Sequence, residues 1–130
     1  MPIRTFLIVF ALLAAAQPQS VNIPDTPAGH TLKAWLDAFN RGDREAYRDF
    51  LQKNFPSRAE HLDEELDFRE RTGGFELRKV EESTPAKLVA LLQERISDQF
   101  ARLTLETETA ATHRITNMEL RAIPRPRPSH

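Results

Sequence analysis

Apolar residues in the first part of the chain recur at helical spacing. Four of them stand at positions i, i+3, i+4 and i+7, which places them on one helix face: Leu32, Trp35, Leu36 and Phe39. Thr26 followed by Pro27 is typical of a helix start, because threonine caps free N–H groups and the missing N–H of proline costs nothing there. Gly42 suits the left-handed conformation that ends a helix. The pattern predicts a helix from Pro27 to residues 40–42, with Trp35 and Phe39 as core anchors.

Two further helices are predicted before Gly74. Asp43 is placed to cap the second helix, and Pro56 ends it. The expected buried face of this helix consists of Ala46, Tyr47, Phe50 and Leu51. Ser57 and Glu60 match the capping box of a third helix, which stops at the glycines 73 and 74. The third helix has a thin apolar stripe among many acidic residues, so we expect it at the surface.

After Gly74 the apolar period changes to alternation. Residues 100–109 and 113–123 alternate apolar and polar side chains, as half-buried strands require. In the second of these strands one side is expected to hold Thr116, Met118, Leu120 and Ala122. Residues 75–82 alternate less well, because Phe75 and Leu77 share a parity that Val80 breaks. This irregularity predicts either a bulge near Lys79 or an inward-pointing Arg78 or Lys79.

Residues 83–96 fit two structures. Thr84 and Pro85 are typical of a helix start, and the leucines that follow stand at helical spacing. Residues 88–92 also suit a central strand buried on both faces, and the strand at residue 100 needs a hydrogen-bonded neighbour. We therefore expect a strand. The predicted fold class is α+β, with N-terminal helices packed on a curved antiparallel sheet of about four strands.

The N-terminal composition predicts export. Arg4 precedes an unbroken apolar run from Phe6 to Ala16, which ends in three alanines. A positive start, a short apolar run and small residues are typical of a cleaved signal peptide. The run is shorter than the roughly 20 residues that span a bilayer. We expect a signal peptide at residues 1–16 and a secreted or periplasmic protein with no membrane association after cleavage.

The remaining chain divides by composition into three parts. Residues 17–27 are proline-rich and polar and predict a linker, residues 28–124 a single domain, and residues 125–130 a Pro/Arg tail. The 130 residues include no cysteine, so the core has to rest on packing without disulfides.

The net charge and the absence of known motifs argue against several classes of function. The formal net charge of −1 gives no electrostatic footprint for nucleic acid. No two of the four histidines stand at the i, i+4 spacing of a helical metal site, so neither a metal nor another cofactor is expected. The serine-hydrolase motifs Ser-x-x-Lys, Gly-x-Ser-x-Gly and Lys-Thr-Gly do not occur, and no catalytic residue is predicted.

Residues 35–51, WLDAFNRGDREAYRDFL, resemble the opening of the nuclear transport factor 2-like (SnoaL-like) superfamily, where a helix ends in a similar FN-x-GD turn. The resemblance implies a cone, also described as cystatin-like, in which a curved sheet wraps around helices over a cavity. Residues 68–83, 88–106 and 113–123 are similar to an extracytoplasmic module that precedes the catalytic domain of secreted serine hydrolases of the beta-lactamase and penicillin-binding type. In those proteins a proline-rich linker leads into the hydrolase domain.

The resemblance implies a secreted, non-catalytic binding or interaction module that is accessory to a serine hydrolase. The side chains expected to line the mouth of the cone are Trp35, Phe39, Phe50, Phe68 and Arg78. The expected partners are a small hydrophobic ligand or a protein, such as a serine hydrolase domain, and a homodimer is also considered.

The alternative is a small isomerase, cyclase or dehydratase, as in other members of the superfamily. Such chemistry needs a carboxylate or histidine in an apolar pocket, beside a group that stabilises an oxyanion. Tyr47 is the one phenol of the chain, and the candidate carboxylates are Asp37, Asp49 and Asp67. Helix periodicity equally predicts that these carboxylates are exposed.

Overall fold

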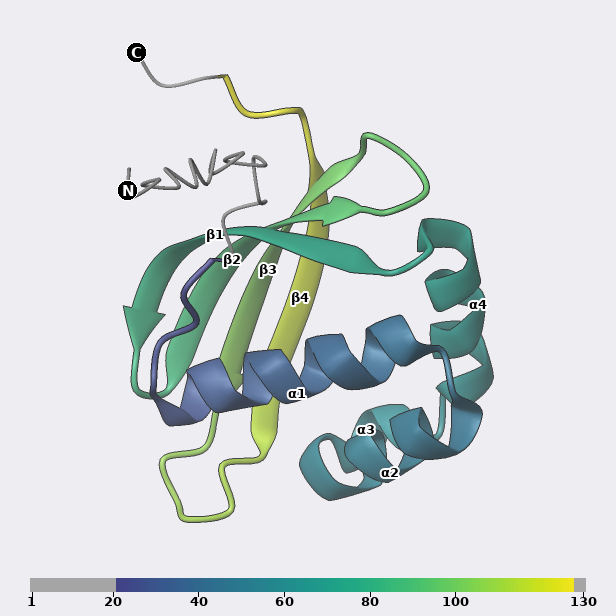
Figure 1. Ribbon diagram of the computed structural model, residues 1–130. Helices are drawn as coiled ribbons and strands as arrows, with labels where there is room; N and C mark the ends of the chain where they lie inside the picture. The colour runs from purple at the N-terminus through teal and green to yellow at the C-terminus, as the bar shows by residue number, and fades with distance from the viewer. Residues whose placement is uncertain (1–20, 128–130) are drawn as a thin grey trace, which may run out of the picture.

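A four-stranded antiparallel sheet carries the helices of the first half of the chain on one side (Figure 1). The computed structural model describes residues 21–127. The expected signal peptide, residues 17–20 of the expected linker and residues 128–130 of the expected tail lie outside this part. In chain order the elements are α1 (Pro27–Arg41), α2 (Arg44–Asn54), α3 (Pro56–Ala59), α4 (Leu62–Thr72), β1 (Phe75–Thr84), β2 (Lys87–Glu94), β3 (Phe100–Thr107) and β4 (Ile115–Ile123). The predicted α+β class is confirmed.

Both ends of α1 follow from the sequence. The Thr26 hydroxyl accepts a hydrogen bond from the Gly29 N–H at 3.0 Å, which satisfies one free donor of the first turn. Gly42 ends the helix with a φ of 71°, a left-handed conformation that glycine adopts without a Cβ clash. Asp43 then caps α2 by accepting from the Glu45 N–H, as predicted.

The third predicted helix is in fact two helices. A continuous helix with a capping box at Ser57 and Glu60 is wrong, because α3 ends at Ala59 and α4 begins at Leu62 without a side-chain cap. Arg58 of α3 donates from Nη2 to the Met118 carbonyl of β4 at 2.7 Å. This contact connects α3 to a strand that is distant in the chain, and a local sequence pattern cannot predict it. α4 itself lies at the surface, as expected, with Leu62 and Thr72 as its buried residues.

β2 lies inside the sheet between β1 and β3, so the strand predicted for residues 88–92 is confirmed over the helical alternative. The three even-numbered residues of this stretch are fully buried on the side of α1, and on the other side Val89 and Leu91 are only 9% and 7% exposed. Burial on both faces explains why the segment is apolar without alternation.

β1 departs from regular pairing twice, between Leu77 and Lys79 and between Val80 and Glu82. The first shift confirms the bulge predicted near Lys79. Because each bulge adds one residue, Leu77 and Val80 both pack against the core. No charged side chain has to point inward to explain the broken alternation.

β4 differs from its prediction at one position. Its register shifts beside Thr107, so that Ile115 takes the inner place and is 6% exposed. The expected inward position of Thr116 is wrong, since this residue is exposed. The remaining residues of the expected inner side, Met118, Leu120 and Ala122, pair with the inner residues of β3.

The core lies between α1 and the sheet. Trp35 and Phe39 are 2% and 1% exposed, which confirms them as core residues. Phe75 at the start of β1 stacks on both rings, with centroid distances of 6.2 Å to Trp35 and 5.7 Å to Phe39.

Within residues 21–127, no helix combines the length and the apolar character that crossing a membrane requires.

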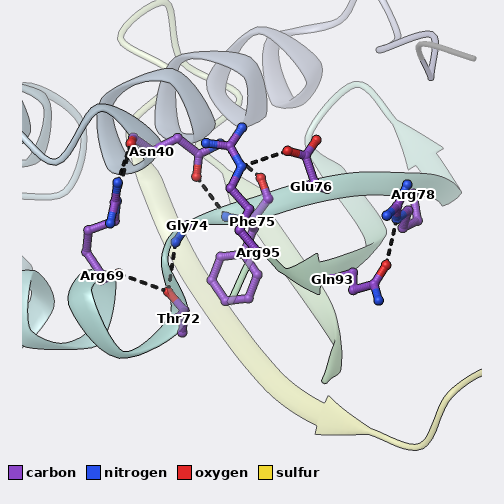
Figure 2. A network of polar contacts seen from close by, with 9 residues as sticks. All are labelled: Asn40, Arg69, Thr72, Gly74, Phe75, Glu76, Arg78, Gln93 and Arg95. Carbon is purple, nitrogen blue, oxygen red and sulfur yellow. Dashed lines mark hydrogen bonds and ion pairs between the residues drawn. The ribbon is translucent and has the colours of Figure 1, made fainter. Parts of the chain in front are cut away.

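Asn40 joins the end of α1 to the start of β1 (Figure 2). Its Nδ2 donates to the Phe75 carbonyl at 2.9 Å, and its Oδ1 accepts from the Phe75 N–H at 2.8 Å. The side-chain amide thus pairs with this residue as a neighbouring strand would. Arg69 of α4 donates to the Asn40 carbonyl at 2.8 Å, so α1, α4 and β1 meet at one asparagine.

Candidate functional site

Four of the five predicted pocket-lining residues belong to one aromatic cluster. Trp35 and Phe39 stack with centroids 5.1 Å apart, and Phe68 lies 5.9 Å from Phe39. Phe50 joins the cluster through Tyr47, whose ring is parallel to it within 4°. Phe75, which was not among the predicted pocket-lining residues, contacts three of these rings. Because the rings pack against one another, they fill the space between helices and sheet.

Arg78, the fifth candidate, lies on the opposite side of the sheet. Its side chain is exposed and its Nε donates to Gln93 Oε1 at 2.9 Å (Figure 2). Gln93 follows the inward-facing Leu92 and therefore points away from α1. An inward Arg78 is thus incorrect, since the bulge at this residue restores the alternation without burying a charge.

A chain of polar contacts leads from the aromatic cluster to the surface at α3 and α4. Trp35 Nε1 donates to the Tyr47 hydroxyl at 3.2 Å, and this hydroxyl donates to Glu65 Oε1 at 3.5 Å. Arg58 Nη1 lies 3.4 Å from the same oxygen, and the Glu65 side chain is only 15% exposed. Sequence reasoning missed Glu65 and Arg58. The available signal was the position of Glu65 three residues after the buried Leu62, on the same helix face.

The environment of Tyr47 keeps its hydroxyl protonated. Burial raises the pKa of Tyr47 far above its usual value of 10.0, and the charge of Glu65 raises it further. A hollow of about 300 Å³ opens nearby, lined by Arg58, His61, Glu64 and Glu65. A neutral phenol can serve as an oxyanion donor. This hydroxyl, however, is already bonded within the protein and does not line the hollow.

The three carboxylates considered for catalysis are all exposed. Asp37 pairs with Lys33 Nζ at 3.0 Å on the surface of α1, and Asp67 lines an open acidic hollow along α4. Carboxylates that are exposed to water lack the apolar surroundings that such acid–base chemistry needs. Across the described part of the chain, no group of three or more His, Asp or Glu side chains is arranged to hold a metal ion.

The side of the sheet turned away from α1 is polar, and we name it the outer sheet face. Its polar residues include Glu76, Arg78, Lys79, Glu81, Glu82, Gln93, Arg102, Thr104, Glu119 and Arg121. Arg102 Nε of β3 lies 2.8 Å from Glu81 Oε1 of β1, so this ion pair spans β2 and covers Val89 and Leu91. A hollow of about 160 Å³ lies between β3 and β4, lined by Arg102, Thr104, Glu119 and Arg121. The outer sheet face therefore combines both charges over a thin apolar layer.

Comparisons with known proteins give no relative for this chain. No protein-family model matches it, and neither a curated protein nor a solved structure does.

Proposed function

We propose that this protein is a secreted, non-catalytic binding or interaction module that uses the outer sheet face. The observation that carries the proposal is that none of the helices in residues 21–127 covers this face, although it spans all four strands. Charged side chains of both signs line it, with an apolar layer below. Such a surface suits a protein partner with complementary charges, because charge complementarity across an interface determines which partner binds.

The fully packed aromatic cluster also favours binding over catalysis. Trp35, Phe39 and Phe75 stack on one another between α1 and the sheet, where the resemblance to the cone-shaped superfamily implies a cavity. The resemblance to modules that precede secreted serine hydrolases suggests the partner class, a hydrolase domain of the beta-lactamase or penicillin-binding type. The proposed role is that of its accessory domain, outside the cytoplasm.

The test measures binding and reactivity of the purified protein. We expect a secreted serine hydrolase domain from the same genome to bind it in calorimetry, and Arg102→Glu to weaken binding at least about tenfold, because reversal disrupts the charge pattern of the face. Lys33→Glu on α1 is the matched control and should bind normally. Neither an acylating penicillin probe nor a chromogenic ester should react with the protein alone. Stoichiometric labelling of a serine would contradict the proposal.

The alternative, a small cone-fold enzyme, has one observation in its favour. Tyr47, Glu65 and Arg58 form a partly enclosed network beside a hollow, and a neutral phenol next to a carboxylate is an arrangement used in acid–base chemistry. The alternative requires that a hydrophobic ligand enters this hollow. Loss of ligand binding in both Tyr47→Phe and Glu65→Gln, with folding retained, would favour the enzyme over the module.

A further inference from the structure

The two edges of the sheet differ in how open they are to another strand. β1 is interrupted by two bulges. In addition, the side chain of Asn40 already hydrogen-bonds the N–H and the carbonyl of Phe75. β4 pairs with β3 without interruption from residue 117 to residue 123. Bulges discourage edge-to-edge pairing, whereas a long regular edge favours it. β4 is therefore the edge at which a further strand can add to the sheet.

Alternate residues of β4 direct their backbone groups to the sheet edge that no other strand within residues 21–127 occupies, the free edge. In an antiparallel strand both backbone groups of a residue point to the same side, and the side alternates along the strand. The Met118 carbonyl accepts from Arg58, which lies outside the sheet, whereas the Ile123 carbonyl accepts from Gln99 next to β3. Met118, Leu120 and Ala122 thus present N–H and C=O groups to an incoming strand. Arg58 uses one of the two lone pairs of the Met118 carbonyl.

The residues between them carry opposite charges. Glu119 and Arg121 lie on the outer sheet face, with side chains 57% and 75% exposed. If a second β4 pairs antiparallel and the centre of symmetry is Leu120, Glu119 of each copy faces Arg121 of the other. A shift of two residues in one direction brings Glu119 against Glu119, and in the other direction Arg121 against Arg121. Opposite charges across a strand pair stabilise it and like charges destabilise it, so the charge pattern selects one register.

We propose that two copies of this chain form a two-fold symmetric dimer in which β4 pairs antiparallel with β4, centred on Leu120. Met118 of each copy then exchanges backbone hydrogen bonds with Ala122 of the other, and the two sheets join into one. The dimer goes beyond the proposed binding function, which a monomeric chain could perform equally.

Charge reversal tests the register. Sedimentation of the purified protein over a range of concentrations should show a monomer–dimer equilibrium. Glu119→Arg and Arg121→Glu should each weaken dimerisation at least about tenfold, because each variant sets like charges opposite one another twice. An equimolar mixture of the two variants should dimerise again, since the arginine introduced in one copy then faces the glutamate introduced in the other. Glu76→Arg is the control with the same charge change on β1, and it should dimerise like the wild type.

A proline variant tests the backbone pairing separately. Ala122 is exposed and its N–H points to the free edge, so Ala122→Pro removes no bond to β3 but removes a donor to the second copy. We expect this variant to be folded, as judged by circular dichroism, and monomeric. A wild type that is monomeric at every concentration would overturn the proposal. It would also be overturned if the variants dimerise as tightly as the wild type, or if mixing the two charge variants restores nothing.

Discussion

The side chain of Asn40 hydrogen-bonds both backbone groups of Phe75, 35 residues further along the chain. It belongs to the last turn of α1 and lies shortly before Gly42, in the FN-x-GD segment. This segment therefore has a structural function here, because it fixes where the first strand starts relative to the first helix. The same contact closes one end of the β1 edge.

Replacing Asn40 should destabilise the fold. Asn40→Ala removes two hydrogen bonds and leaves the Phe75 backbone without these partners, which should lower the free energy of unfolding by about 1–3 kcal/mol. Asn117→Ala is the control, since this asparagine is exposed and bonds only Glu106 in the contacts described, and it should change the value by less than about 0.5 kcal/mol. Chemical denaturation measures both. Equal effects of the two substitutions would show that the hydrogen bonds between Asn40 and Phe75 add no stability.

Trp35 should contribute strongly to stability through the aromatic cluster. Trp35→Ala opens a cavity at the centre of the core and removes the donor to Tyr47, which should cost about 3–5 kcal/mol. Lys33→Ala lies on the same helix with an exposed side chain and should cost about 0.5 kcal/mol or less. Urea denaturation of both variants checks this, and near-wild-type stability of Trp35→Ala would be inconsistent with its core position.

Tyr47, the single tyrosine, should resist ionisation while the protein is folded. Its pKa is raised in the folded state above the value of 10.0 expected for the unfolded chain. The stabilising effect of the neutral phenol is thus complete below about pH 10 and is lost as the pH rises above it, by at most about 1.4 kcal/mol per pH unit. An absorbance titration should show phenolate only when the protein unfolds. Tyr47→Phe should lack this part of the alkaline destabilisation, and a folded protein that forms phenolate near pH 10 would contradict the burial of the hydroxyl.

Two glycines at helix ends should differ in their tolerance of alanine. Gly42 and Gly73 both have a φ of 71°, but a Cβ at Gly73 would overlap Ile96 Cγ1, whereas at Gly42 it would meet Arg69 at 3.4 Å. Gly42→Ala should cost about 1 kcal/mol from its backbone conformation. Gly73→Ala should cost more stability than Gly42→Ala. Adding Ile96→Ala to Gly73→Ala should recover part of this extra cost, because it removes the overlapping side chain. Ile96 is 67% exposed, so its own loss should cost little. Thermal unfolding of the single and double variants tests this, and strictly additive effects would exclude the contact.

Much of the fold could be predicted from local pattern. The caps at Thr26, Gly42 and Asp43 and the alternation of the last two strands are properties of neighbouring residues, which is why α1, α2, β3 and β4 agree closely with their predictions. Predicting the strand at residues 87–94 required one further argument. The strand that begins at residue 100 needs a neighbouring strand to hydrogen-bond with it. The candidate site was less predictable, because helical periodicity identifies an apolar face but cannot tell a packed core from the wall of a pocket.

By itself the sequence determined the number of strands, the helix ends at residues 26–43 and the apolar faces, since these depend on backbone conformation and side-chain period. Tertiary structure alone decided the helix break between Ala59 and Leu62, the role of Phe75, the outward direction of Arg78 and the enclosure of Glu65. Each of these depends on a contact between segments far apart in the chain. Hydrogen bonds and ring stacking at such distances are fixed by how the helices lie on the sheet, and a local pattern does not identify the partner residue.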